Sequence, residues 1–274
     1  MSTAFVTGAT DGIGLHTAHR LAASGRFAKI LIHGRDPARL DRAKESILAS
    51  SIGVQLETFL ADFSELRQVK KMCADILDRH AGTGLAGPIV NNAGVFSEQQ
   101  VVTDDGFELT YQTNVLAPHI ITSMLHPIAS GKIIHVASIS ASSAVDLEAY
   151  RSRAVNQRTP YSAHRAYSES KLLNVMQACA YAERLRGRLT VQSLDPGTVN
   201  TKMLQAGWGM CGIPVSSADN QFSLAMREGE TGEGGYFVND RLARYPSALC
   251  TDPSSLLFLL EMLVDQTGTA FSDF

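Results

Sequence analysis

The stretch Thr7-Gly8-Ala9-Thr10-Asp11-Gly12-Ile13-Gly14 decides the fold, because it places three glycines between a short apolar segment and a helical pattern. Glycine permits a tight turn and lets the backbone approach a phosphate group closely. The helix that follows offers free N–H groups and the positive end of its dipole to that phosphate. The stretch therefore predicts a dinucleotide-binding turn, and a glycine-rich turn that binds nothing is the alternative.

Apolar strand patterns and helical patterns alternate outward from this turn. Strands are expected at 3–7, 29–33, 54–60, 88–91, 132–137, 190–194 and 235–238. Helices are expected at 12–24, 36–50, 64–80 with Ser64 as its cap, 104–124, 161–186, 216–228 and 253–265. This alternation predicts an α/β fold of the Rossmann-like kind, with a single doubly wound parallel sheet and helices on both faces.

We expect one domain, 1–274, with insertions on the substrate side near 140–160 and 200–215. Residues 140–159 are polar and residues 205–214 are rich in glycine, so both stretches are expected to be irregular. Each follows the carboxyl end of a predicted strand, where open α/β sheets bind their ligands.

The composition excludes several classes of protein. The 274 residues are 45% hydrophobic and 19% charged, and the net charge of −3 argues against a nucleic acid or an anionic membrane as partner. Four scattered cysteines without a C-x-x-C motif suggest neither a zinc cluster nor a disulfide framework, so we expect no metal and a reducing compartment. The absence of a long apolar run and of a leader segment favours a cytoplasmic protein without a membrane span. A homo-oligomer is compatible with the sequence.

Arg35 follows the second predicted strand, where an acid normally binds the ribose 2′-hydroxyl and an arginine accepts a 2′-phosphate. It therefore favours NADP(H) over NAD(H), and a solvated surface arginine is the alternative. Two carboxylates oppose the preference: Asp36, which is also placed to cap the next helix, and Asp11 inside the glycine turn. Asp62-Phe63 after the third strand is suited to bracketing an adenine, or Asp62 caps the following helix.

Tyr167 and Lys171 lie four residues apart in a helical segment, so their side chains share one face. The lysine ammonium is expected to lower the pKa of the phenol, which is about 10 in water. A phenol brought toward neutrality can exchange a proton with an alcohol or carbonyl oxygen. Tyr150 and Tyr161 compete for this role, but neither has a lysine four residues further on.

From residue 3 to about 265 the chain resembles the short-chain dehydrogenase/reductase family. The resemblance rests on residues 7–14, Asn91-Asn92-Ala93-Gly94, Asn114, Ser138, Tyr167-x-x-x-Lys171 and Pro196-Gly197, which occur in the family's order. It implies that Tyr167 is the general acid/base and that Lys171 lowers its pKa and holds the nicotinamide ribose. Ser138 is implied to bind the substrate oxygen, and Asn114 to hold a water in the proton relay.

The resemblance also implies contacts along the cofactor. Asn92 and Ala93 would lie beside it, and Val199 and Thr201 would meet the nicotinamide carboxamide. Together with the glycine turn, the expected cofactor-binding residues are Gly8, Thr10, Asp11, Gly12, Ile13, Gly14, Arg35, Asp62, Phe63, Asn92, Ala93, Gly94, Tyr167, Lys171, Pro196, Gly197, Val199 and Thr201.

Ser138 and Tyr167 are 29 positions apart, which is longer than in compact members of the family. This spacing resembles the retinol-dehydrogenase-like and WW-domain-oxidoreductase-like branch, from which Asp195 before Pro196-Gly197 departs. Ser140 competes with Ser138 but lies further from the strand end. Trp208, with its apolar neighbours, is placed to line an apolar pocket or to serve only the fold.

The sequence thus predicts an NADP(H)-dependent oxidoreductase that interconverts a carbonyl and an alcohol on a bulky apolar small molecule. Two alternatives stay open at this point. One is a non-catalytic sensor or scaffold that keeps the nucleotide pocket, and the other is an NAD-dependent alcohol dehydrogenase.

Overall fold

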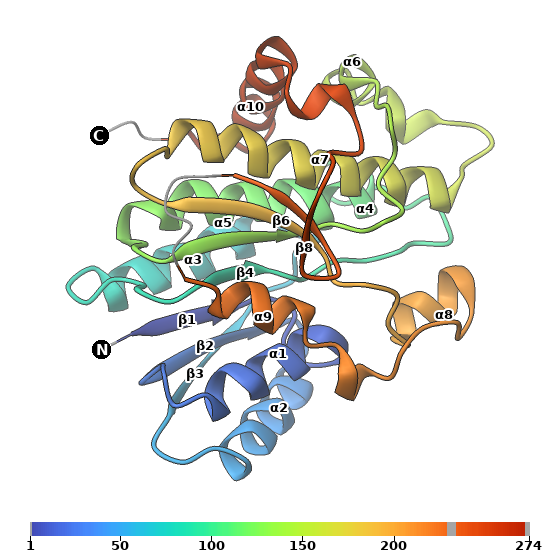
Figure 1. Ribbon diagram of the computed structural model, residues 1–274. Helices are drawn as coiled ribbons and strands as arrows, with labels where there is room; N and C mark the ends of the chain where they lie inside the picture. Colours follow the sequence, from blue (N-terminus) through green and yellow to red (C-terminus); the bar gives the residue numbers. More distant parts are fainter. Residues whose placement is uncertain (1, 229–233, 272–274) are drawn as a thin grey trace.

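The computed structural model describes residues 2–228 and 234–271, and in these ranges eight strands form one sheet (Figure 1). The strand order is β3-β2-β1-β4-β5-β6-β7-β8. All neighbours are parallel except β7 and β8, which are antiparallel. The strands are β1 (Thr3–Val6), β2 (Lys29–Gly34), β3 (Gln55–Leu60), β4 (Ile89–Asn91), β5 (Lys132–Val136), β6 (Thr190–Asp195), β7 (Tyr236–Val238) and β8 (Arg241–Ala243). The predicted parallel α/β sheet is confirmed, and β8 is an additional strand.

Helices cover both faces of the sheet (Figure 1). One face carries α1 (Gly12–Ala23), α2 (Pro37–Ala49) and α9 (Asn220–Met226). The other carries α3 (Leu66–His80), α5 (Ala117–Leu125) and α7 (Ala163–Arg184), with α10 (Pro253–Thr267) packed on α7. The shorter segments are α4 (Leu109–Tyr111), the π-helix η1 (Gln112–Leu116), α6 (Leu147–Arg151), α8 (Lys202–Trp208) and the single turns η2 (His126–Ile128), η3 (Ala154–Gln157), η4 (Val215–Ser217) and η5 (Ala248–Cys250). Across the described ranges, no helix is both long and apolar enough to cross a membrane.

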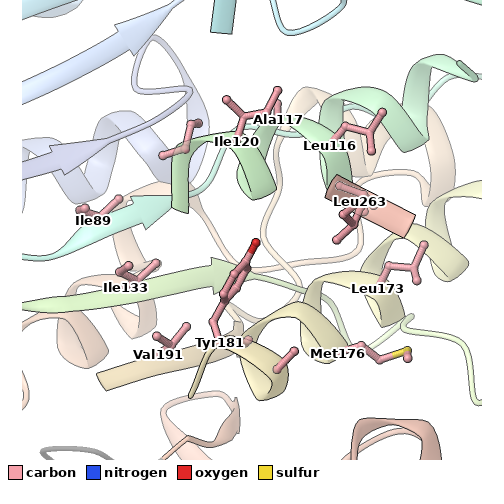
Figure 2. Close-up of a cluster of buried hydrophobic side chains, with 14 of the residues drawn as sticks. Ile89, Leu116, Ala117, Ile120, Ile133, Leu173, Met176, Tyr181, Val191 and Leu263 are labelled. Atoms are coloured by element: carbon pink, nitrogen blue, oxygen red, sulfur yellow. The ribbon is translucent and has the colours of Figure 1, made fainter. Parts of the chain in front are cut away.

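Each strand sends alternate side chains into two separate hydrophobic clusters. In β1, Ala4 and Val6 join the cluster under α1 and α2, whereas Phe5 joins the cluster under α3, α5 and α7. Figure 2 shows the second cluster, in which Ile133 and Val191 of the sheet face side chains of α5 and α7. Burial on both faces is the reason why central strands such as β1 are mostly apolar.

Two predicted helix starts are wrong because residues other than the expected ones supply the helix caps. Ser64 does not cap α3; instead, the backbone N–H of Leu66 donates to Asp105 Oδ2 at 2.8 Å. The helix expected from residue 104 begins at Leu109. Its cap is the buried Glu108, whose carboxylate accepts from the backbone N–H groups of Thr110 and Tyr111 at 2.9 and 2.8 Å.

Both substrate-side insertions contain helices where irregular chain was expected. Within 205–214, α8 continues to Trp208 and ends at Gly209, which has a φ of +78°. Thr201 caps its start by accepting from the N–H of Leu204 at 3.1 Å. Within 140–159, α6 is fastened to α7 because Tyr150 donates a hydrogen bond to the buried Glu169 at 2.8 Å. Helix capping and a buried carboxylate therefore override the loop-like composition.

Three of the buried histidines have a pKa that burial lowers strongly. Burial lowers the pKa of His33 and of His119 to about 4, with opposing hydrogen bonds to backbone oxygens, and that of His135 to about 3. A histidine in an unfolded chain titrates near a pKa of about 6.5. Between these values the unfolded chain binds more protons than the native one, so stability decreases as the pH falls.

We expect the free energy of unfolding to fall from pH 7 to pH 5, by up to about 1.4 kcal/mol per pH unit for each histidine once the pH is below 6.5. Urea unfolding at several pH values measures this slope. His119→Gln removes one titrating group and should make the slope shallower. A free energy of unfolding that stays constant between pH 7 and pH 5 would contradict the assignment.

Candidate active site

The glycine-rich turn is fastened to the end of β4 by Thr7. Its Oγ1 accepts from the backbone N–H groups of Asn92 and Ala93, both at 3.0 Å. Asn92 also binds the turn through its side chain: its Nδ2 donates to Thr7 O at 2.8 Å and to Gly8 O at 3.3 Å. The turn and the Asn92-Ala93 segment therefore form one rigid wall.

Close packing of this wall leaves no room for side chains at two glycines. A Cβ on Gly14 would lie 2.3 Å from Asn92 Nδ2 and 2.4 Å from Gly8 O. Gly8 has a φ of +64°, and a Cβ there would lie 2.8 Å from Ala93 Cα. The bare backbone beside the N-terminus of α1 is a cradle suited to a phosphate group.

His33 supports the same turn from β2. Its Nδ1 accepts from the N–H of Gly8 at 3.1 Å, and its Nε2 donates to Ala61 O at 3.0 Å. These partners require the neutral ring, in agreement with its lowered pKa. Its ring stacks on Phe63 at 4.2 Å between centroids. His33 is a site residue that the sequence reasoning missed; its only signal was a polar residue at the end of an apolar strand.

A cavity of about 410 Å³ runs along the carboxyl ends of the strands. The expected residues that line it are Gly8, Thr10, Asp11, Gly12, Ile13, Gly14, Arg35, Asp62, Phe63, Asn92, Ala93, Gly94, Tyr167, Lys171, Pro196 and Thr201. Those that do not line it are Asn114, Ser138, Gly197 and Val199. The lining also includes residues that were not expected, among them His33, Arg39, Thr113, Lys202 and Met203.

One end of the cavity is rich in cations. Arg35 is exposed there, and within the described part of the chain it makes no ion pair. Asp11 Oδ2 accepts from Arg39 at 2.7 Å and from Lys202 at 2.6 Å. Burial raises the pKa of Asp11, but the hydrogen bond from Lys202 and the other contacts outweigh it and lower the pKa. The carboxylate expected to oppose a 2′-phosphate therefore already has two cationic partners.

The other two carboxylates at this end also have local partners. Asp36 caps α2, because its Oδ1 accepts from the N–H of Arg39 at 2.8 Å. Asp62 Oδ1 accepts from the N–H and Oγ of Ser64 at 2.9 and 2.8 Å, which makes a turn before α3 rather than a cap on it. Asp62 still lines the cavity.

Asn114 lies in the π-helix η1. Its Oδ1 accepts from the N–H of Val95 at 2.7 Å, and its Nδ2 donates to Val95 O at 3.0 Å and to Ser170 Oγ at 3.0 Å. The side chain thus holds the strand-to-loop segment after Gly94 against α7. Such π-helical turns occur often at functional sites.

The structure brings Tyr167, Lys171 and Ser138 together at the opposite end from the arginines. Lys171 Nζ donates to Val136 O at 2.8 Å and lies 5.4 Å from the centroid of the Tyr167 ring. The Ser138 side chain acts on the Tyr167 phenol and lowers its pKa. The competing Ser140 instead donates its backbone N–H to Ser138 Oγ at 3.1 Å.

Burial dominates the electrostatics of this trio. Burial raises the pKa of Tyr167 to about 12, with Asp195 adding to the rise and the hydrogen bond with Ser138 opposing it. Burial lowers the pKa of Lys171 to about 8, and the charge of Asp195 opposes that change. Helical spacing predicts the proximity of the two side chains but not their desolvation, and desolvation is the largest effect on both pKa values. The lowering of the Tyr167 pKa by Lys171 stays a prediction.

The two competing tyrosines are held elsewhere. Tyr161 donates to Glu108 Oε1 at 3.1 Å and to Ser97 O at 3.2 Å, whereas Tyr150 donates to Glu169. Burial and the adjacent Glu108 raise the pKa of Tyr161 to about 12. Neither tyrosine lines the cavity.

Aromatic rings cover the outer side of Tyr167. Its ring lies 5.8 Å from that of Phe96 and 5.3 Å from that of Trp208. His164, one turn earlier on α7, bonds through Nε2 to Gly207 O of α8 at 2.9 Å. No residue of α8 is buried, so this helix is held to the site through a few contacts of this kind.

Comparison with known proteins identifies the class of protein to which this cavity, cradle and Tyr167–Lys171 pair belong. Residues 2–209 match the short chain dehydrogenase family. The chain belongs to this family of oxidoreductases, whose members use a nicotinamide cofactor, and it has relatives among the retinol dehydrogenases.

Individual relatives support the same class. A protein of Streptomyces sp. strain C5 named as a candidate daunorubicin C-13 ketoreductase is 36% identical over 73% of this chain and 67% of its own length. Human retinol dehydrogenase 13 is 28% identical over 98% of this chain and 75% of its own length. Among solved structures, the NADPH-bound carbonyl reductase from chicken fatty liver shares the fold, with a TM-score of 0.67 at 23% identity over 89% of this chain and 99% of the other.

Gly14→Ala tests the cradle, because the added Cβ would displace Asn92 or Gly8. We expect a loss of nicotinamide-cofactor affinity of at least roughly tenfold and a lower melting temperature, since overpacking costs about 1–3 kcal/mol. The matched control is Gly82→Ala, where nothing lies within 4 Å of the added atom. Calorimetric titration and thermal unfolding measure both effects, and equal cofactor affinity in the two variants would contradict the assignment.

Proposed function

We propose that the chain is a single-domain, NADP(H)-dependent reductase of bulky apolar carbonyl compounds, with Tyr167 as the proton donor. The observation that carries the proposal is the arrangement along one cavity. The hydroxyl of Tyr167 and the ammonium of Lys171 lie at one end, and the glycine cradle and the cations lie at the other.

The lining fits a nicotinamide dinucleotide, which supplies a hydride when bound. Gly8, Gly12 and Gly14 would receive the pyrophosphate, and Arg35 with Arg39 would receive the adenosine 2′-phosphate. Lys171 would hold the nicotinamide ribose. The hydrogen bonds between Thr7 and the Asn92-Ala93 segment keep this groove fixed before binding.

The protein residues then manage the proton and the developing charge. As negative charge builds on the substrate oxygen, Tyr167 donates its proton and Ser138 donates a hydrogen bond. The raised pKa of Tyr167 keeps that proton in place at neutral pH, which suits the acid required for reduction. The Lys171 ammonium stabilises the phenolate left behind.

Apolar side chains around Tyr167 support a bulky apolar substrate. Trp208, Met210 and Ile213 follow one another along the segment beside the site and are 38%, 59% and 43% exposed, and Ile139 next to Ser138 is 64% exposed. Trp208 contacts the Tyr167 ring, and exposed apolar surface of this kind beside the site suits an apolar substrate. The relatives named for daunorubicin and for retinol support a small-molecule substrate.

Tyr167→Phe removes one hydroxyl and should abolish NADPH-dependent turnover of a panel of aromatic and aliphatic ketones, with a loss of at least about 100-fold. Cofactor affinity and melting temperature should stay near those of the unmodified protein. Tyr161→Phe is the matched control and should retain turnover. If no carbonyl compound is turned over although NADPH binds, a non-catalytic nucleotide-binding protein is the better description.

Arg35→Ala tests the cofactor preference. NADPH should bind more tightly than NADH, and the substitution should remove most of the difference, roughly tenfold or more, since a charge-assisted contact contributes about 1.5–3 kcal/mol. Arg42→Ala, an exposed arginine on α2 outside the cavity lining, is the control. Equal dissociation constants for NADPH and NADH in the unmodified protein would favour the NAD-dependent alternative.

A further inference from the structure

Helix α8 contacts the candidate site at both of its ends. It has no buried residue and lies outside the layers formed by the sheet and its covering helices (Figure 1). Its first residue, Lys202, and its last, Trp208, lie about 9 Å apart along the helix axis, because an α-helix rises about 1.5 Å per residue. A helix without buried side chains is an element of low local stability, so its position depends on few contacts.

The C-terminal end of α8 lies over the proposed proton donor. The ring of Trp208 is 5.3 Å from that of Tyr167 and 5.0 Å from that of Phe96. His164 of α7 bonds to Gly207 O at 2.9 Å, and a Cβ on Gly207 would lie 3.2 Å from Phe96 Cζ. The place of Trp208 over Tyr167 therefore depends on how α8 is held.

The N-terminal end of α8 is joined to the glycine-rich turn by one carboxylate. Lys202 Nζ donates to Asp11 Oδ2 at 2.6 Å, and Arg39 of α2 donates to the same oxygen at 2.7 Å. Asp11 Oδ1 accepts from the backbone N–H of Gly12 at 2.8 Å. These three charged side chains line the cavity together with Arg35. Asp11 thus links α8, α2 and the turn at the phosphate end of the cavity.

This cluster of charges is open to exchange with a ligand. The side chains of Asp11, Arg39 and Lys202 are 48%, 39% and 80% exposed. Exposed ion pairs are weak, because water and salt screen them. A phosphate group carries more charge and more acceptor oxygens than a carboxylate, so the same two cations bind it more strongly. A phosphate that enters the cavity can therefore replace Asp11 as their partner.

We propose that Lys202 is a positioning residue that couples the phosphate end of the cavity to the position of α8. Arg39 and Lys202 exchange Asp11 for the 2′-phosphate of NADP(H), and this stronger contact keeps α8 in place with Trp208 over Tyr167. The coupling is reciprocal, so a substrate that packs under Trp208 strengthens phosphate binding by the same factor. The inference rests on the proposed function, since it takes NADP(H) as the cofactor.

The single tryptophan of the chain, Trp208, reports the position of α8 without turnover. The probe is 2′,5′-ADP, which carries the 2′-phosphate but lacks the nicotinamide half that would approach Tyr167. At saturation it should lower the acrylamide quenching constant of Trp208 fluorescence by at least roughly 1.5-fold, because α8 opens less often. The matched ligand 5′-AMP lacks the 2′-phosphate and should leave the constant unchanged. Equal protection by both ligands would overturn the assignment to the 2′-phosphate.

Lys202→Met removes the ammonium and keeps an unbranched side chain with good helix propensity. It should weaken 2′,5′-ADP binding by roughly twofold to fivefold in calorimetric titration, as expected for an exposed charge, and abolish the protection of Trp208 at saturation. Lys202→Arg should restore both. Lys44→Met is the matched control, because Lys44 lies on α2 outside the cavity lining, and it should behave as the unmodified protein.

The possible failures separate this inference from the proposed function. If 2′,5′-ADP binds but Trp208 is equally accessible with and without it, or if Lys202→Met keeps the full protection, Lys202 has no coupling role and the proposed cofactor stands. If 2′,5′-ADP does not bind, the preference for NADP(H) fails and the coupling fails with it.

Discussion

The contact between Thr7 and the Asn92-Ala93 segment is the constraint on which the site depends. It joins the ends of β1 and β4, which are neighbours in the sheet. The strand order reverses here, because the strand after β1 lies on one side of this pair and the strand after β4 lies on the other. Open α/β sheets form a crevice at such a point. Because the hydroxyl of Thr7 closes the gap between the two strand ends, the glycine cradle and the Asn92 wall keep one geometry from which the cavity extends toward α7.

Burial then sets the chemistry at the far end of the cavity. Tyr167 and Lys171 project from a helix whose residues are almost entirely enclosed, so desolvation moves their pKa values in opposite directions, to about 12 and about 8. The neutral form is favoured for each side chain. In such a site the phenol of Tyr167 stays protonated. Negative charge nearby favours the protonated form of Lys171 against the effect of burial.

The sheet and most of the expected residues could be predicted because their signals are local. Apolar runs mark strands such as 29–33 and 132–137, and the glycine spacing marks the turn between β1 and α1. The cap at Leu66 could not be predicted, since Asp105 lies 39 positions away in the chain. The cap at Thr110 is local but comes from Glu108, a buried glutamate rather than one of the usual capping residues. Likewise, the helix that ends at Trp208 depends on a threonine cap within a composition that favours a loop.

Three of the unexpected lining residues, His33, Arg39 and Lys202, act through partners that sequence spacing does not reveal. The strand pattern around His33 gave no sign of its role, yet its ring accepts a hydrogen bond from Gly8 and stacks on Phe63. Arg39 and Lys202 converge on Asp11 from 28 and 191 positions away in the chain. Sequence pattern therefore predicts which backbone segments line the cavity, while the charges that surround it are determined only when distant segments pack together.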